Sequence, residues 1–185
     1  MLNPILIIIA LNLGFFLAVQ ISPGLVYDLG LWSPTEVFFK HPWGLVTSMF
    51  VHEEFFHFFA NMITLFFFGS YLNRLIGSRK LLLVYFGGGI LGSIFFILLT
   101  PSFSLPAVGA SGAVFALGGA MAVVVPRLRV FIFPIPAPIP LWIAVIGGFV
   151  ILSFLPYVAW EAHLGGLVLG LVAGYIFRGK RHYYH

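Results

Sequence analysis

The chain has 185 residues, of which 61% are hydrophobic and only 8% are charged, and its mean hydropathy is +1.11. These values lie far outside the range of soluble globular domains, so they predict an all-α, polytopic membrane protein with a single domain over residues 1–185. The net charge of +4 does not indicate nucleic-acid binding, because the basic residues lie in short connections between apolar segments. The chain contains no cysteine, which excludes disulfide bonds and thiol catalysis.

Apolar segments bounded by proline, glycine or charged residues predict six membrane-spanning helices. The first has no Lys or Arg before it and is followed by further apolar segments, so we interpret it as a span and not as a signal peptide. The predicted helices lie near residues 5–21, 52–72, 80–99, 110–125, 140–155 and 158–177.

The basic residues divide unevenly between the two sides of such a bundle. One side carries only Lys40. By the positive-inside rule the other side faces the cytoplasm, which predicts that both termini are cytoplasmic and agrees with an even number of spans. The residues on that side are Arg74, Arg79, Lys80, Arg127, Arg129, Arg178, Lys180 and Arg181.

Two connections have distinctive compositions. The segment 22–51 carries Trp32 and Trp43 in an apolar background, which predicts that it lies in the outer membrane interface. The segment 126–140 has five prolines, four of them in alternation from Pro134 onward. This spacing excludes a helix and predicts extended or polyproline backbone.

Ser111 and His163 are the candidate catalytic residues of the apolar segments. An ionisable side chain at membrane depth is costly to bury without a partner, so His163 indicates a functional site. At about 1.5 Å per residue, Ser111 lies roughly 22 Å above the inner end of its helix and His163 roughly 8 Å below the outer start of its own. Both therefore fall in the outer half, where a neutral imidazole can act as general base for a serine nucleophile.

Small residues predict that these two helices pack closely. Gly166, Gly170 and Gly174 form a small-xxx-small ridge, and Gly112 follows the serine. Because Ser111 begins its helix, backbone N–H groups at that point are directed at any oxyanion that forms there.

The second predicted helix carries polar residues that suit an oxyanion site. His57 and Asn61 are four residues apart and share one helix face, and both are donors of the kind that stabilise a tetrahedral oxyanion. His52 is rotated from His57 by roughly 140° on the same helix, which predicts that it faces elsewhere, at the outer water boundary.

These residues resemble the rhomboid family of intramembrane serine proteases, in its prokaryotic six-helix form, over nearly the whole chain. Three motifs carry the resemblance: GxSG in the fourth helix, AHxxGxxxG in the sixth and HxxxN in the second. Each motif is weak alone, but the three in this order are specific. The matching residues are Gly109-Ala110-Ser111-Gly112, Ala162-His163 with Gly166 and Gly170, and His57 with Asn61.

The resemblance implies a Ser-His dyad with Ser111 as nucleophile and His163 as general base. It implies oxyanion donors at His57, Asn61 and the backbone of Gly109 and Ser111, and it calls for no metal or organic cofactor. The implied substrates are single-pass transmembrane proteins whose helix is locally weak near the cut. Membrane lipid is the other expected partner, nucleic acid is not expected, and the implied location is a prokaryotic plasma membrane with the active site toward its outer face.

Other residues of the chain either support the dyad or depart from the family pattern. Gly112 and Gly166 are expected to support it by close packing. Rhomboids often have an aromatic hydroxyl stacked on the histidine, and Phe115, one turn below Ser111, is expected to stack there instead. The family usually has Trp-Arg in the first loop, whereas Trp43 is followed here by Gly44, so the contacts of the arginine are missing. Asn73 stands where many members have a glutamate.

Other catalytic arrangements do not fit these residues. Glu161 points away from His163 on a helix, so we assign it to the outer interface and not to a triad. A zinc protease would need His-Glu-x-x-His, and the spacing from His52 to His57 is one residue too long. Two-aspartate catalysis is excluded because Asp28 is the only aspartate.

Two further functions remain as alternatives to a protease. A catalytically silent rhomboid-like protein would bind membrane clients, and loss of the serine or the histidine would favour it. A small transporter or channel would need polar residues through the inner half as well, which is almost wholly apolar. For a protease, the fifth helix, with Gly147-Gly148 between Pro140 and Pro156, is the expected gate for lateral substrate entry.

Overall fold

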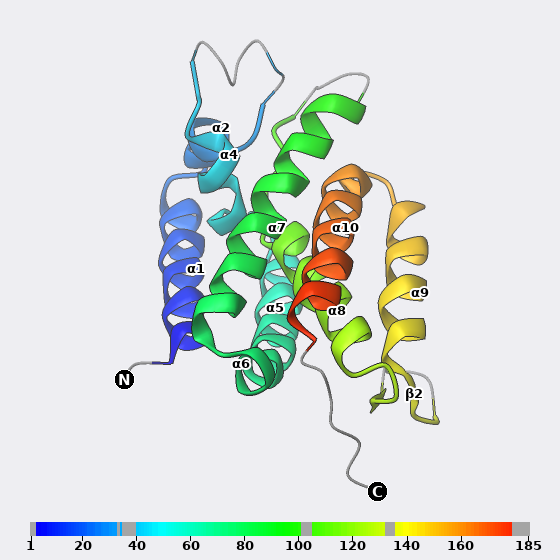
Figure 1. The fold of residues 1–185 in the computed structure, drawn as a ribbon. Helices are drawn as coiled ribbons and strands as arrows, with labels where there is room; N and C mark the ends of the chain where they lie inside the picture. The colour runs from blue at the N-terminus through cyan, green and yellow to red at the C-terminus, as the bar shows by residue number, and fades with distance from the viewer. Residues whose placement is uncertain (1–2, 33, 35–39, 101–104, 132–135, 179–185) are drawn as a thin grey trace, which may run out of the picture.

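The computed structural model describes residues 3–32, 34, 40–100, 105–131 and 136–178, and this part of the chain is mostly helical. The long helices lie side by side in one bundle (Figure 1). The second predicted helix continues through a π-helical turn, η2, as one apolar rod. The bundle helices are α1 (Pro4–Ile21), α5 (Phe55–Thr64), η2 (Leu65–Gly69), α6 (Ser70–Ile76), α7 (Ser78–Leu99), α8 (Ser111–Val124), α9 (Leu141–Ser153) and α10 (Trp160–Phe177).

These helices occupy the apolar segments that the sequence predicts, with ends that differ by a few residues. Among the described residues, four helical rods are long and apolar enough to cross a membrane: α1, α5 through α6, α7 and α10. The other two, α8 and α9, are apolar but shorter. Length and composition therefore identify four candidate spans, where the sequence predicted six.

Local sequence signals fix the helix ends. Asn3 caps α1, since its side-chain oxygen accepts a hydrogen bond from the N–H of Ile5 at 3.0 Å, and Pro4 follows at the first helical position. Gly77 ends α6 and directly precedes α7 with a φ of 83°. A side chain at that φ would be strained, so glycine permits the tight reversal between the two helices.

The first connection folds over the C-terminal end of α1, and its described residues include three short helices, of which Figure 1 shows α2 and α4 there. The indole N–H of Trp43 donates to the carbonyl of Asp28 at 2.7 Å, and the Thr47 hydroxyl donates to the carbonyl of Leu29 at 2.6 Å. A Cβ on Gly44 would lie 2.6 Å from the carbonyl oxygen of Gly30. At Gly44, where the resemblance predicts an arginine, the chain thus packs closely against the backbone of Gly30. The elements are α2 (Leu25–Leu29), α4 (Gly44–Thr47) and η1 (Ser48–Phe50).

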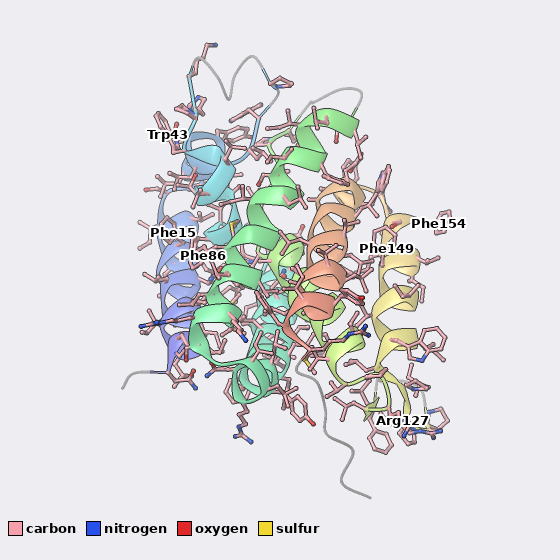
Figure 2. All side chains as sticks on the ribbon, viewed as in Figure 1. Phe15, Trp43, Phe86, Arg127, Phe149 and Phe154 are labelled. Atoms are coloured by element: carbon pink, nitrogen blue, oxygen red, sulfur yellow. The ribbon has the colours of Figure 1, made fainter. Side chains whose placement is uncertain are left out.

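Aromatic side chains pack at the interface between the first connection and the helix bundle. The ring of Phe50 in η1 lies 5.7 Å from that of Phe15 and 6.4 Å from that of Phe86, measured between centroids. Figure 2 shows Trp43 and Arg127 at opposite ends of the molecule.

The proline-rich connection is extended only in part: its described residues include a turn at Pro126 and Arg127, bends at Pro136 and Ala137, and two short strands. Strands β1 (Arg129–Val130) and β2 (Ile139–Pro140) pair antiparallel, with Arg129 opposite Pro140. Pro134, in the alternating run, lies outside the described residues, as do Lys180 and Arg181.

The core is centred on α8, which packs against α7, α9, α10 and η2. Nearly every residue of α8 from Gly112 to Ala122 is buried. A Cβ on Gly166 would overlap the carbonyl of Gly112, and a Cβ on Gly170 would overlap that of Ala116. Small residues at four-residue spacing therefore bring the backbones of α8 and α10 into contact.

Candidate active site

Ser111 and His163 meet at the interface of α8 and α10. Ser111 is the first residue of α8, and the Oγ of Ser111 lies 2.8 Å from the Nε2 of His163. The histidine is buried, with 5% of its surface exposed. This hydrogen bond depends on the close helix packing, because Gly166, one turn beyond His163, lies against Gly112, the neighbour of Ser111.

The imidazole of His163 is oriented by an aromatic ring. The centroid of Phe115 lies 4.6 Å from that of His163, at an interplanar angle of 32°. The Nδ1 of His163 is buried and has no hydrogen-bond partner among the described residues. No carboxylate contacts this nitrogen in the described part of the chain, so ring stacking and the bond to Ser111 hold the imidazole.

The loop before Ser111 is held by two hydrogen bonds that its backbone N–H groups donate, one to a carbonyl and one to a side chain. Gly109 has a φ of 119°, and its N–H donates to the carbonyl of Ser48 at 2.9 Å. The N–H of Ala110 donates to the Nε2 of His52 at 3.3 Å. The predicted oxyanion donor at Gly109 is therefore already engaged in this structure. The N–H of Ser111 has no intrahelical partner, because Ser111 is the first helical residue.

His57 in α5 lies against the same loop, and Asn61 lies one turn further along α5. A Cβ on Gly109 would lie 2.6 Å from the Nε2 of His57, so the imidazole covers this glycine. The side-chain nitrogen of Asn61 donates to the carbonyl of His57 at 2.9 Å, and Asn61 is buried. An amide has two N–H groups, so this bond leaves Asn61 a second donor.

The predicted position of His52 is wrong. His52 is fully buried, its ring centroid lies 5.0 Å from that of His57, and it accepts the hydrogen bond of Ala110. The helical rotation used for the prediction does not apply, because α5 begins only at Phe55. The adjacent Glu53 and Glu54 were the available signal, since acidic residues commonly lie where a helix starts.

Burial and the nearby His57 ring lower the pKa of His52 from its ordinary 6.5 to about 3. The imidazole is therefore neutral at physiological pH, as its hydrogen bonds require. Its Nε2 accepts from Ala110, while its Nδ1 lies 3.4 Å from the carbonyl of Phe50 and can donate to it. A protonated His52 has no acceptor nitrogen and would release the Ala110 N–H.

Glu161 lies in the first turn of α10 and is buried, with 6% of its surface exposed. Its assignment to the outer membrane interface stays a prediction. Negative charge is favourable at that position because the N-terminal end of a helix dipole is positive.

A small cavity lies beside the nucleophile. It has a volume of about 30 Å³ and is lined by residues that include Met49, Ser93, Ser111 and Ala162. This volume is enough for one water molecule.

The fold and the site together define a helical membrane protein with a hydrogen-bonded serine and histidine in its core. Residues 40–180 match the family model of the Rhomboid domain. The chain belongs to the rhomboid family.

The relatives of this chain include one that is named a protease and one that is named inactive. Rhomboid protein 1, mitochondrial, of Saccharomyces cerevisiae is 30% identical over 149 residues, which cover 71% of this chain and 40% of the yeast protein. Rhomboid protease GluP of Bacillus subtilis is 32% identical over 133 residues, 71% of this chain and 25% of that protein. Inactive RHOMBOID-like protein 8 of Arabidopsis thaliana is 30% identical over 127 residues, 68% of this chain and 35% of that protein. The chain thus matches less than half the length of each relative.

Proposed function

We propose that this protein is an intramembrane serine endopeptidase that cleaves transmembrane segments of membrane-anchored proteins. The observation that supports this most directly is the 2.8 Å contact between the Oγ of Ser111 and the Nε2 of His163. A serine hydroxyl within hydrogen-bond reach of a buried imidazole is the arrangement that general-base activation of a nucleophile needs.

The proposed reaction passes through an acyl-enzyme. The Oγ of Ser111 attacks the scissile carbonyl while Nε2 of His163 takes the hydroxyl proton. The imidazolium then gives this proton to the leaving amine as the C–N bond breaks. Water next attacks the ester, His163 takes a proton from it, and that proton returns to Ser111 as the carboxylic acid product leaves. The cavity beside Ser111 has room for this water molecule.

Three donors are proposed for the oxyanion: the N–H of Ser111, the imidazole of His57 and the side-chain amide of Asn61. Their support is the position of Ser111 at the start of α8 and the packing of His57 over Gly109. The N–H of Gly109 is left out of this set because it donates to Ser48. Each such donor typically contributes about 100- to 1000-fold to the rate.

The proposed topology has six membrane crossings, cytoplasmic termini and an active site that opens toward the outer face of a plasma membrane. The asymmetric distribution of Lys and Arg supports it. The short α8 is enclosed by neighbouring helices. Because its neighbours enclose it, α8 can begin below the outer surface of the membrane. Ser111 would then lie at the bottom of a depression that water enters from outside.

Single-pass substrates would enter laterally beside α9. Gly147 and Gly148 of α9 have no neighbouring atoms where their Cβ atoms would be. Only Leu141 and Val145 of this helix are buried. Engineered cysteines that lock α9 to α5 are expected to abolish cleavage of a transmembrane substrate, whereas undiminished cleavage would exclude α9 as the gate.

Active-site labelling with a fluorophosphonate tests the proposal. The purified protein is expected to label on Ser111, Ser111→Ala is expected not to label, and His163→Ala is expected to label at least about 100-fold more slowly. Labelling that persists in Ser111→Ala would overturn the assignment of the nucleophile.

A client-binding protein without catalysis is the second candidate. The relative named Inactive RHOMBOID-like protein 8 shows that the family contains a member named as inactive. The contact between Ser111 and His163 favours the protease. A wild-type protein that is folded but neither labels nor cleaves a model transmembrane substrate would favour client binding instead.

A further inference from the structure

An apolar groove runs between α7 and α10 at the inner end of the bundle. The two helices are in close contact nearer the outer end, where a Cβ on Gly92 would lie 2.7 Å from the carbonyl of Ala162. Toward the inner end they leave a groove of about 230 Å³. Buried Val84 and Ala173 line it together with the exposed Val172 and Ile176.

One cationic side chain, that of Lys80, contacts the inner mouth of this groove, and two further cations, Arg79 and Arg178, lie next in the chain to residues of the mouth. The Nζ of Lys80 lies 5.3 Å from the ring centroid of Phe177, which is itself a lining residue. Arg178 follows directly, with its guanidinium carbon 4.1 Å from the ring centroid of Tyr175. Arg79, beside Lys80, is exposed as well. The mouth therefore combines the first turn of α7 with the last turn of α10.

Among the residues that the structure describes, no acidic residue lies at this end of the bundle. The chain has five Asp and Glu residues, and all of them lie before α5 or in the first turn of α10. Figure 1 shows that the start of α10 and the short helices α2 and α4 are at the opposite end of the bundle from α6 and the end of α10. Attraction to an anion at the groove mouth is therefore not reduced by a carboxylate of any described residue.

We propose that this groove and its cationic mouth form a binding site for one anionic phospholipid. An acyl chain lies along the groove between α7 and α10, and the phosphate lies between Lys80 and Arg178. An apolar channel that ends at two cations matches the chemistry of such a lipid, with its tail and its charged headgroup in that order. Basic pockets between transmembrane helices on the cytoplasmic side bind anionic headgroups in the same way. The proposal does not depend on the proposed protease activity.

Lipid retention by the full-length protein in detergent tests this site. The protein, as Ser111→Ala to prevent self-cleavage, is titrated with phosphatidylglycerol or phosphatidylcholine, and bound lipid is counted by native mass spectrometry. We expect phosphatidylglycerol to bind more tightly. In the double variant Lys80→Gln, Arg178→Gln it should bind about 30-fold more weakly, because each basic residue near an anionic headgroup contributes about a factor of five. Inorganic phosphate, as a further arm, should not compete, because it has no tail for the groove.

Two matched variants separate this site from general attraction to a basic surface. Val172→Trp, at a 55% exposed position, should fill the groove and weaken binding of both lipids without disturbing the core. The double variant Arg127→Gln, Arg129→Gln removes two cations from another inner connection and should retain the preference for phosphatidylglycerol. Equal loss in the two double variants, or unchanged binding in Lys80→Gln, Arg178→Gln, would overturn the proposal. Retained helical circular dichroism excludes misfolding as the cause of a loss.

Discussion

The α8–α10 interface and the helix α9 are packed in opposite ways. Between α8 and α10 the contacts are backbone to backbone, and no space remains for a Cβ on Gly166. On α9, by contrast, Gly147 and Gly148 face open space, and most of the helix is at least partly exposed. The serine and the histidine lie at the tight interface. The protein thus builds its candidate site where movement is most restricted and leaves the adjacent helix loosely held.

One aromatic contact joins these two regions. The ring of Phe149 in α9 meets the ring of Phe115 edge-on at 6.1 Å between centroids, and Phe115 stacks on His163 (Figure 2 labels Phe149). A displacement of α9 would therefore disturb the ring that stacks on the imidazole. The contrast between a tight interface and a loose helix can be tested one contact at a time.

Gly166→Ala should have the largest effect, because it directly separates α8 from α10. The new Cβ would overlap the carbonyl of Gly112, so the helices must move apart and lengthen the bond between Ser111 and His163. Overpacking of this kind typically costs about 1–3 kcal/mol of stability. Fluorophosphonate labelling should be nearly abolished and the unfolding midpoint in detergent lowered.

Gly147→Ala is the matched control for this change. It adds the same methyl group to α9, where nothing lies within 4 Å. It should leave labelling and the unfolding midpoint close to wild type. Similar losses in the two variants would contradict the proposed difference between the regions.

Gly109→Ala should have the next largest effect, and it should act on activity more than on stability. The backbone φ of 119° is strained for a side chain, and the Cβ would meet the His57 ring. Displacement of the loop and of His57 is expected to lower the rate of substrate cleavage about 100-fold or more, as for the loss of an oxyanion donor. Cleavage of a fluorogenic transmembrane peptide measures this loss, and a wild-type rate would exclude a role for this loop conformation.

His52 gives a smaller effect with a defined pH dependence. His52→Leu leaves the Ala110 N–H without an acceptor, which typically costs about 1–3 kcal/mol, whereas Gln can still accept this bond. Because the pKa of His52 is lowered from 6.5 to about 3 on folding, the unfolded chain binds more protons in this pH range. Its contribution to stability therefore falls as the pH falls from about 6.5 toward 3.

His52→Gln should flatten this acid dependence while it retains most activity at pH 7. The measurement is the shift of the unfolding midpoint between pH 7 and pH 4.5 in wild type and in the variant. The other histidines are present in both proteins, so a difference between the two shifts comes from His52. Parallel pH profiles for the two proteins would show that His52 does not titrate in this range.

Local patterns allowed the sequence to predict much of this arrangement. In a helix, residues four apart lie on one face, so the sequence alone predicts that Gly166 and Gly170 share a face and that His57 and Asn61 share another. The depth estimate for Ser111 and His163 rests on helix rise alone. Each of these inferences remains within regular helices, where position follows from residue number.

The remaining features depend on irregular backbone, for which no such rule exists. His52 precedes α5 by three residues, so its direction is set by a loop that reaches Ala110. The engagement of the Gly109 N–H depends on Ser48, far away in the sequence. The need for a glycine at position 44 likewise comes from a tertiary contact with the backbone of Gly30. Tertiary hydrogen bonds between loops carry no periodic signal in the chain.

Phe149→Ala should have the smallest effect and the most specific one. It removes the edge-on contact with Phe115, and pairs of this kind contribute about 0.5–1.5 kcal/mol. If α9 moves to admit substrate, weakening its contact with α8 makes that movement easier. Cleavage of a transmembrane substrate should then be a few-fold faster, up to about tenfold.

A small fluorophosphonate needs no lateral entry, so its rate of labelling should not change in Phe149→Ala. The matched control is Phe154→Ala, which removes an 83% exposed ring from the same end region of α9 and should alter neither rate. If labelling falls together with cleavage in Phe149→Ala, then Phe149 holds His163 in place through Phe115. In that case α9 is part of the rigid site and not of the substrate entrance, and the distinction between a tight α8–α10 interface and a loosely held α9 would be wrong.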